Sequence, residues 1–143
     1  MFFGTYEHAI DDKGRITIPA KYRRWLDLGV VITKGIERCL LAYPTEGWQE
    51  FVEKARALPL TNTGAREFKR LLFGGASECE PDKQGRIVLQ QRLREYANID
   101  NQVIFIGLDD HFEIWNAEIW REAEAKGDND PDWRAENFAN LGF

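Results

Sequence analysis

The sequence predicts a mainly β fold of the α+β class, with short helices and an acidic C-terminal tail, built as a tandem duplication. The first observation is that residues 11–15 read DDKGR and residues 82–86 read DKQGR, 71 positions apart. Each pentapeptide starts with Asp and ends with Gly-Arg. The second observation is that the segments after them are short and rich in β-branched residues, as strands are. A chain of 143 residues that is 43% hydrophobic can bury one compact core or two small ones.

The duplication extends beyond the two pentapeptides. Aligning position n with n+71, and with n+72 after one inserted residue near 100, pairs identical residues in the same order. The pairs are Gly4 with Gly75, Glu7 with Glu78, Asp11 with Asp82, Gly14 with Gly85, Arg15 with Arg86, Ile16 with Ile87, Arg23 with Arg94, Val31 with Val103, Gly35 with Gly107, Glu46 with Glu118 and Trp48 with Trp120. The alignment predicts a first unit at 5–47, connecting helices and a loop at 48–75, a second unit at 76–119, and a C-terminal helix and acidic tail at 120–143.

Each unit is predicted to begin with two short strands and a helix. TYEHAI and ASECE are the first strands, and RITI and RIVL, with β-branched alternation, are the second. Pro19 suits the first turn of the helix AKYRRWL, which we expect to bury Tyr22, Trp25 and Leu26. The matching helix of the second unit should bury its own apolar side chains, Leu93, Tyr96 and Ala97.

The second half of each unit is predicted to be a pair of strands followed by a helix. VVITKG and QVIFIG are buried-strand runs that end at Gly, and CLLAYP and HFEIW follow them. The next helices begin near Thr45 and Asn116, which could act as N-caps. Between the units, PLTNTG (59–64) is predicted as a loop and AREFKRLLF (65–73) as a helix closed by Gly74 and Gly75. The tail GDNDPDWRAENFANLGF should be loosely ordered or weakly docked.

The distribution of charge matters more here than the net charge of −5. Residues 1–108 hold 16 Lys and Arg against 14 Asp and Glu, whereas residues 109–136 hold 3 against 10. Residues 11–24 carry five basic and two acidic side chains, and residues 82–94 carry four and one. Because local basic patches govern phosphate binding, an acidic whole-chain balance does not exclude nucleic acid as a partner.

The two pentapeptides admit two interpretations. Gly14 and Gly85 allow a positive φ in a tight turn, and the aspartates can accept hydrogen bonds from the following backbone N–H groups. Each Arg would then start a strand beside its turn, where it could meet a phosphate or the O6/N7 edge of guanine. Alternatively, each Arg pairs with its own Asp and only stabilises the hairpin. The sequence leaves both interpretations open.

These residues carry a resemblance to a known family. The matching stretches are GTYEHAIDDKGRITIPAKYR, LAYPTEGW, RLLFGGASEC, DKQGRI and GLDDHFEIWN, which together cover most of residues 2–120. The chain resembles the MraZ family of bacterial transcriptional regulators, whose units are AbrB-like swapped-hairpin modules. The resemblance implies that the two units form a pseudo-two-fold double-split β-barrel.

The resemblance also implies a function and a set of site residues. It implies sequence-specific binding to direct repeats of double-stranded DNA, upstream of the division and cell-wall gene cluster, by a homo-oligomeric ring. The expected DNA-binding residues are Asp11, Lys13, Gly14, Arg15 and Lys21 in the first unit, and Asp82, Lys83, Gly85 and Arg86 in the second. The second unit departs from the pattern at Gln84 and Gln90, which stand where the first has Lys13 and Pro19. We therefore expect the second unit to hold DNA less firmly or to serve mainly in folding and assembly.

The sequence also contains residue types that occur in metal sites. The repeat alignment pairs His8 with Cys79 and Cys39 with His111, a set that could make a Cys2His2 metal site. The spacings C-x-x-C and H-x-x-x-H are missing, and a Cys on a strand often acts as a small hydrophobe, so we expect no metal. The sequence has no G-x-S-x-G, P-loop or H-E-x-x-H motif, so we expect no enzyme, cofactor or small-molecule substrate.

The remaining expectations concern location and partners. Apolar runs are too short to span a membrane and the N-terminus does not resemble a secretory signal, which favours a cytoplasmic, nucleoid-associated protein. The alternative function is a protein-interaction or ring-assembly module without specific DNA binding. Its subunit contacts would come from large apolar residues, otherwise explained by core packing: Leu40, Tyr43, Trp48, Phe112, Trp115 and Trp120. The acidic tail is either a solvated face or a competitor for the basic hairpins.

Overall fold

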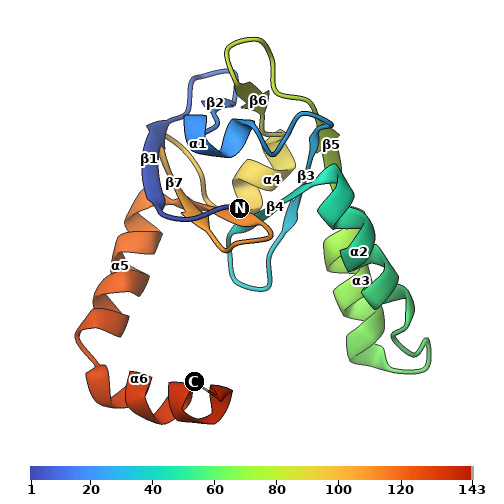
Figure 1. The fold of residues 1–143 in the computed structure, drawn as a ribbon, viewed down its shortest axis with the longest axis vertical. Helices are drawn as coiled ribbons and strands as arrows, with labels where there is room; N and C mark the ends of the chain where they lie inside the picture. The colour runs from blue at the N-terminus through green and yellow to red at the C-terminus, as the bar shows by residue number, and fades with distance from the viewer. Residues whose placement is uncertain (143) are drawn as a thin grey trace.

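The computed structural model describes residues 1–142 and has the mixed α+β architecture that the sequence predicts (Figure 1). The strands are β1 (Thr5–Ala9), β2 (Arg15–Thr17), β3 (Val30–Lys34), β4 (Leu40–Pro44), β5 (Ser77–Cys79), β6 (Arg86–Val88), β7 (Gln102–Gly107) and β8 (Phe112–Asn116). The helices are α1 (Ala20–Arg23), α2 (Thr45–Arg56), α3 (Thr63–Gly75), α4 (Gln91–Tyr96), α5 (Ala117–Asp128) and α6 (Pro131–Phe138), followed by the 3₁₀ turn η1 (Ala139–Leu141).

The strands form two antiparallel sheets. The larger sheet has six strands in the order β1-β7-β8-β4-β3-β5, and the smaller is a ribbon of β2 and β6. Because β1 and β5 are the edges of the larger sheet, this sheet is not closed into a barrel by hydrogen bonds. Figure 1 shows the ribbon at one end of the molecule, with α2, α3, α5 and α6 extending toward the other end.

The two halves of the chain are interleaved, because the hairpin β7-β8 of the second half lies between β1 and β4 of the first half. Within the larger sheet β1 pairs with β7, β3 with β5 and β4 with β8, and in the ribbon β2 pairs with β6. Each of these ladders joins a strand of the first half to a strand of the second. The exchange of hairpins therefore takes place within one chain.

One face of the large sheet covers the main core. Buried side chains from both halves meet there, including Ile16 and Ile87 from the ribbon and Tyr22 and Leu93 from the short helices. The opposite face is covered by helices: α2 packs its Trp48 on β3 and β4, and the start of α5 packs near β7 and β8. Trp48, together with four other residues of the alternative assembly surface, is buried within this chain: Leu40, Tyr43, Phe112 and Trp115.

The N-terminal segment belongs to the core, although the repeat alignment predicts that the first unit begins at residue 5. Phe2 is fully buried, with its N–H donating to the Asp109 carbonyl at 2.9 Å. Its ring lies 5.2 Å from the rings of Tyr22 and Phe112. Burial, followed by the proximity of Tyr6, raises the pKa of Tyr22 to about 12. The protonated Tyr22 hydroxyl donates to the Gly4 carbonyl at 3.1 Å.

Two local expectations are wrong. Trp25 is not buried with Tyr22, because α1 ends at Arg23 and Trp25 lies beyond it, under the guanidinium of Arg24 at 4.8 Å. Thr45 does not cap α2, since its hydroxyl donates to the Leu28 carbonyl at 3.1 Å. The other expected cap is present: the Asn116 side chain accepts the N–H of Ile119 at 3.0 Å.

Two helices differ from their expected forms. The helix between the units begins at Thr63 rather than at residue 65, because the Asn62 side chain caps it by accepting the Ala65 N–H at 2.9 Å. The tail contains the helix α6, which starts with an Asp130 cap and Pro131 and buries no residue. Phe143, the end of the expected tail, lies outside the described residues. Figure 1 places α6 far from the ribbon and its turns.

Candidate nucleic-acid interface

The first pentapeptide forms a tight turn organised by its aspartate. The Gly14 N–H donates to the Asp11 carbonyl at 3.0 Å, and Gly14 has a φ of 78°. The Asp11 carboxylate accepts the backbone N–H groups of Lys13 and Arg15, each at 2.9 Å. Its second oxygen accepts Nε–H of Arg15 at 2.6 Å. The turn thereby fixes the backbone and the start of the Arg15 side chain together.

The second pentapeptide repeats this geometry. The Asp82 carboxylate accepts the N–H groups of Gln84 and Arg86 at 2.9 Å, and Nε–H of Arg86 at 3.0 Å. The Gly85 N–H donates to the Asp82 carbonyl at 2.9 Å, with a φ of 75° at Gly85. The pairing of each Arg with its own Asp is therefore confirmed, whereas the idea that the pair only stabilises the hairpin stays a prediction. This pairing engages Nε of each arginine, and within residues 1–142 the two Nη atoms of each guanidinium make no hydrogen bond.

The ribbon brings the two turns into one surface. In its register Arg15 faces Val88 and Arg86 faces Thr17, while the Ile16 and Ile87 pair points into the core. Since alternate residues of a strand share a face, Arg15 and Arg86 lie on the same outer face, roughly 7 Å apart along the strand direction. The antiparallel pairing puts their turns at opposite ends of the ribbon.

Backbone hydrogen bonds also join each turn to the opposite half of the chain. The Ile18 N–H donates to the Gly85 carbonyl, and the Leu89 N–H donates to the Gly14 carbonyl, both at 2.8 Å. Each turn is thus held by the segment that follows β2 or β6 of the other half. A change in one half will therefore be felt at the turn of the other.

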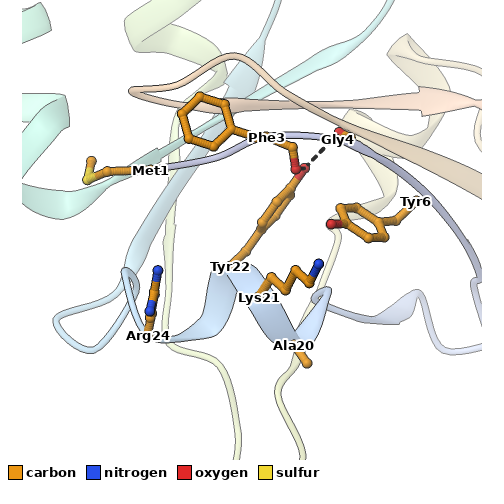
Figure 2. Close-up of a pocket in the computed structure, with 8 residues that line it drawn as sticks. All are labelled: Met1, Phe3, Gly4, Tyr6, Ala20, Lys21, Tyr22 and Arg24. Carbon is orange, nitrogen blue, oxygen red and sulfur yellow. Dashed lines mark hydrogen bonds between the residues drawn. The ribbon is translucent and has the colours of Figure 1, made fainter.

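The predicted lysines are not all grouped together. Lys13 and Lys83 are exposed within the turns. Lys21 lies instead on α1 and lines a pocket of about 680 Å³ beside the N-terminal segment, with Phe3 and Tyr6 on its walls. Figure 2 shows the Lys21 side chain directed toward Tyr6. Among the described residues that line this pocket, none belongs to either turn.

Two basic residues missing from the predicted set lie against the turns. Arg94 of α4 packs on Gly14, and Arg23 of α1 packs on Gly85. The repeat alignment contained the pattern that could have identified them, because it pairs Arg23 with Arg94. Their position matters because the turns themselves carry little positive charge. Residues 11–15 have a net charge of zero, and residues 82–86 have a net charge of +1.

The residues considered for a metal site lie in separate environments. Cys39 is buried against Trp115, and burial raises the pKa of its thiol. His8 makes an edge contact with Phe105 at 5.4 Å, and His111 stacks on Tyr43 at 4.6 Å. Within residues 1–142 no group of three or more His, Cys, Asp or Glu side chains is arranged to hold a metal ion. Over the same residues, no helix is long and apolar enough to cross a membrane.

The aspartates of the turns have lowered pKa values, which predicts a loss of stability in acid. The N–H of Arg15 holds the pKa of Asp11 below its usual value of 3.8, and the N–H of Arg86 does the same for Asp82. Because both pKa values are lower in the folded state, this contribution to stability is complete above pH 3.8 and is lost as pH falls through the folded values. We expect Asp11→Asn with Asp82→Asn to flatten the fall in melting temperature below about pH 4, as measured by circular dichroism.

A matched control is available in the same turn. Among the described residues, none donates a hydrogen bond to the Asp12 carboxylate, so Asp12→Asn should retain the acid dependence of the parent protein. An unchanged acid dependence in the Asp11 and Asp82 double variant would show that these carboxylates do not link the turns to folding.

Fold and site together define a class: a tandemly duplicated α+β protein in which two turns of the pattern D-x-x-G-R flank a ribbon shared by both halves. A family model described as "MraZ protein, putative antitoxin-like" matches residues 1–71 and, a second time, residues 72–138. The chain belongs to the MraZ family.

Individual relatives agree with this assignment along the whole chain. A protein of Moorella thermoacetica is 51% identical over 122 residues, covering 85% of each chain. Proteins of Syntrophomonas wolfei and Lactiplantibacillus plantarum are each 45% identical, and cover 100% and 99% of this chain and 100% of their own. All three carry the name Transcriptional regulator MraZ.

Proposed function

We propose that this chain is a sequence-specific DNA-binding transcriptional regulator of the bacterial division and cell-wall gene cluster. In this proposal a homo-oligomeric ring binds direct repeats upstream of the cluster, in the cytoplasm and associated with the nucleoid. Residues 5–47 and 76–119 serve as its two hairpin modules. The names of the relatives and the two matched turns on one ribbon support the proposal.

The observation that carries the proposal is the way each turn holds its arginine. Asp11 and Asp82 engage Nε of Arg15 and Arg86, and no hydrogen bond within residues 1–142 occupies the Nη atoms of either guanidinium. A guanidinium fixed on one edge can present its other edge to the O6 and N7 atoms of guanine, or to a phosphate. Holding the side chain in advance reduces the entropy lost when DNA binds.

The remaining site residues are assigned by position. Lys13 and Lys83, exposed in the turns, would contact phosphates and set the register of the protein on the duplex. Gly14 and Gly85 would let the backbone make the turn, and Lys21 would reach a phosphate from α1. One ribbon offers few cations, so several copies in a ring would gain affinity by binding repeated sites together.

The proposal is tested by DNA binding with the region upstream of this protein's own gene. We expect Arg15→Ala to weaken binding by roughly 5- to 150-fold, the range for one bidentate base contact, and Arg86→Ala to weaken it less. Fluorescence anisotropy over a salt series would measure both the affinity and the salt dependence. Arg56→Ala is the matched control, because it removes the same charge from the last residue of α2, a helix that extends away from the ribbon (Figure 1).

One observation favours the second candidate, an assembly module without specific DNA binding. The helix α6 buries no residue and leaves Trp133 and Phe138 each 52% exposed, as a protein-contact surface would. The two candidates differ at Arg15. Equal, weak binding by the parent protein, Arg15→Ala and Arg56→Ala would reject the DNA-binding proposal and favour assembly.

A further inference from the structure

Two arginines, Arg23 and Arg94, each lie against the turn of the opposite half of the chain. A methyl group built on Gly14 would lie 3.0 Å from Cζ and 3.1 Å from Nε of Arg94. The equivalent methyl group on Gly85 would lie 2.5 Å from Cζ of Arg23. Each guanidinium therefore packs against the glycine backbone of a turn, with no space for a side chain between them. Arg23 also helps to line a hollow of about 260 Å³ beside Asp82 and Gly85.

The hydrogen bonding of these arginines is incomplete. Nε of Arg23 donates to the Ile18 carbonyl at 2.9 Å, but the buried Nε of Arg94 has no hydrogen-bond partner within residues 1–142. Over the same residues, neither arginine forms an ion pair. The unneutralised charge of Arg23 is felt locally, since burial and then this charge lower the pKa of His8. A buried donor without a partner is costly, so the presence of Arg94 at this position calls for a role.

We propose that Arg23 and Arg94 are positioning residues, each of which holds the turn of the opposite half of the chain in place. Arg94 holds the turn at 11–15 and thereby Arg15, and Arg23 holds the turn at 82–86 and thereby Arg86. Each also adds a positive charge beside a turn. With both arginines included, the combined net charge of the two turns rises from +1 to +3. The effect on the turns stands on the geometry alone, whereas its consequence for DNA rests on the proposed function.

The planar guanidinium is central to this role. A flat group can lie against the glycine backbone, whereas the tetrahedral ammonium of lysine at the end of a flexible chain cannot pack in the same way. The hydrogen bond from the Leu89 N–H to the Gly14 carbonyl also joins the second half of the chain to the first turn. Loss of Arg94 should therefore loosen the first turn and leave the second intact.

Amide hydrogen exchange measured by NMR tests the positioning without any DNA. In Arg94→Gln the N–H groups of Lys13 and Arg15 should exchange several-fold faster, while those of Gln84 and Arg86 stay unchanged. Arg23→Gln should give the opposite pattern. Faster exchange in the turn of the arginine's own half, in both turns, or in neither would overturn the proposal.

Adjacent arginines serve as matched controls for this experiment. Arg92 donates to the Gly74 carbonyl at 3.1 Å, and Arg24 stacks over Trp25, so neither is engaged with a turn. Arg92→Gln removes the same charge from α4, and Arg24→Gln removes it from the C-cap of α1. They should leave exchange in both turns unchanged, and an equal effect of Arg92→Gln on Lys13 would show that charge, and not contact, governs the turn.

Double-mutant cycles extend the test to DNA affinity. We expect Arg94→Gln to be non-additive with Arg15→Ala, by about threefold or more, and additive with Arg86→Ala within about twofold. Arg23→Gln should couple with Arg86→Ala in the same way. Arg94→Lys, which keeps the charge, should not restore the affinity of the parent protein, and full restoration would overturn the positioning role. If the parent protein does not bind DNA, the proposed function fails and the exchange experiment alone decides the roles of Arg23 and Arg94.

Discussion

Phe2→Ala is expected to lower the free energy of unfolding by about 3–5 kcal/mol, the range for removing a fully buried phenylalanine. The neighbouring Phe3→Ala should change it by less than about 0.5 kcal/mol, because Phe3 is 67% exposed. The two variants remove the same ring from adjacent positions of the chain. They differ only in where the fold places that ring.

The large cost at Phe2 follows from its neighbours. Its ring packs edge-on to Tyr22, with the planes at 87°, and lies tilted against Phe112. Tyr22 and Phe112 are themselves fully buried and come from α1 and β8, so a cavity at Phe2 would open the core where the two halves meet. The exchanged backbone bonds between Phe2 and Asp109, at 2.9 and 2.8 Å, would limit how far the segment could move to fill the cavity.

Urea unfolding followed by tryptophan fluorescence would measure both variants. The dependence of the unfolding free energy on urea should stay near the parent value, which would show that only stability has changed. Similar losses in Phe2→Ala and Phe3→Ala would contradict the core position of Phe2. A loss below about 1 kcal/mol at Phe2 would show that the core closes around the cavity.

The sequence predicted best those features that are set by local interactions. The turns from Asp to Arg are specified by five consecutive residues. The hydrogen bonds that the Asp11 carboxylate accepts, and the positive φ at Gly14, both lie within the turn itself. The same locality explains why Asn116 could be identified as a cap. Strand segments such as VVITKG could be located for a similar reason, since VVIT is a run of β-branched residues.

Features set by distant contacts could not be predicted in the same way. Nothing in the residues of β3 specifies that β5, from the other half, lies beside it. Trp25 fits a helical apolar stripe, but its burial depended on a helix long enough to include it, and α1 ends two residues earlier. Phe2 and Phe3 are identical in type and adjacent, so only the tertiary pairing with Asp109 decides which one is buried.

The site shows the same division between local and distant causes. The pairing of Asp11 with Arg15 was open as one of two interpretations, and the structure confirms it. The joining of Arg15 and Arg86 on one face required the ribbon, whose two strands lie in different halves of the sequence. The contact of Arg94 with Gly14 likewise depends on this exchange, so the residues next to Arg94 in the sequence could not indicate it.

Residues 1–71 expressed alone are expected not to fold as a monomer. In that fragment β1 would lose β7, β3 would lose β5, and β2 would lose β6. The main core draws its buried residues from both halves, so the fragment would also expose Ile16, Ile18 and Tyr22 to water. The apolar area left unburied is then too large for the remaining contacts to offset the entropy of ordering the chain.

Mixing this fragment with residues 72–143 should restore the fold, since together the two supply every ladder of both sheets. Circular dichroism would follow the recovery, and light scattering would give the mass of the species formed. Removal of residues 129–143 is the matched control: it takes away α6 and η1 but no strand, so the shortened protein should fold. A monomer of residues 1–71 that unfolds cooperatively would contradict the interleaved architecture. A folded pair of 1–71 copies would instead agree with it, because the second copy could occupy the place of the missing half.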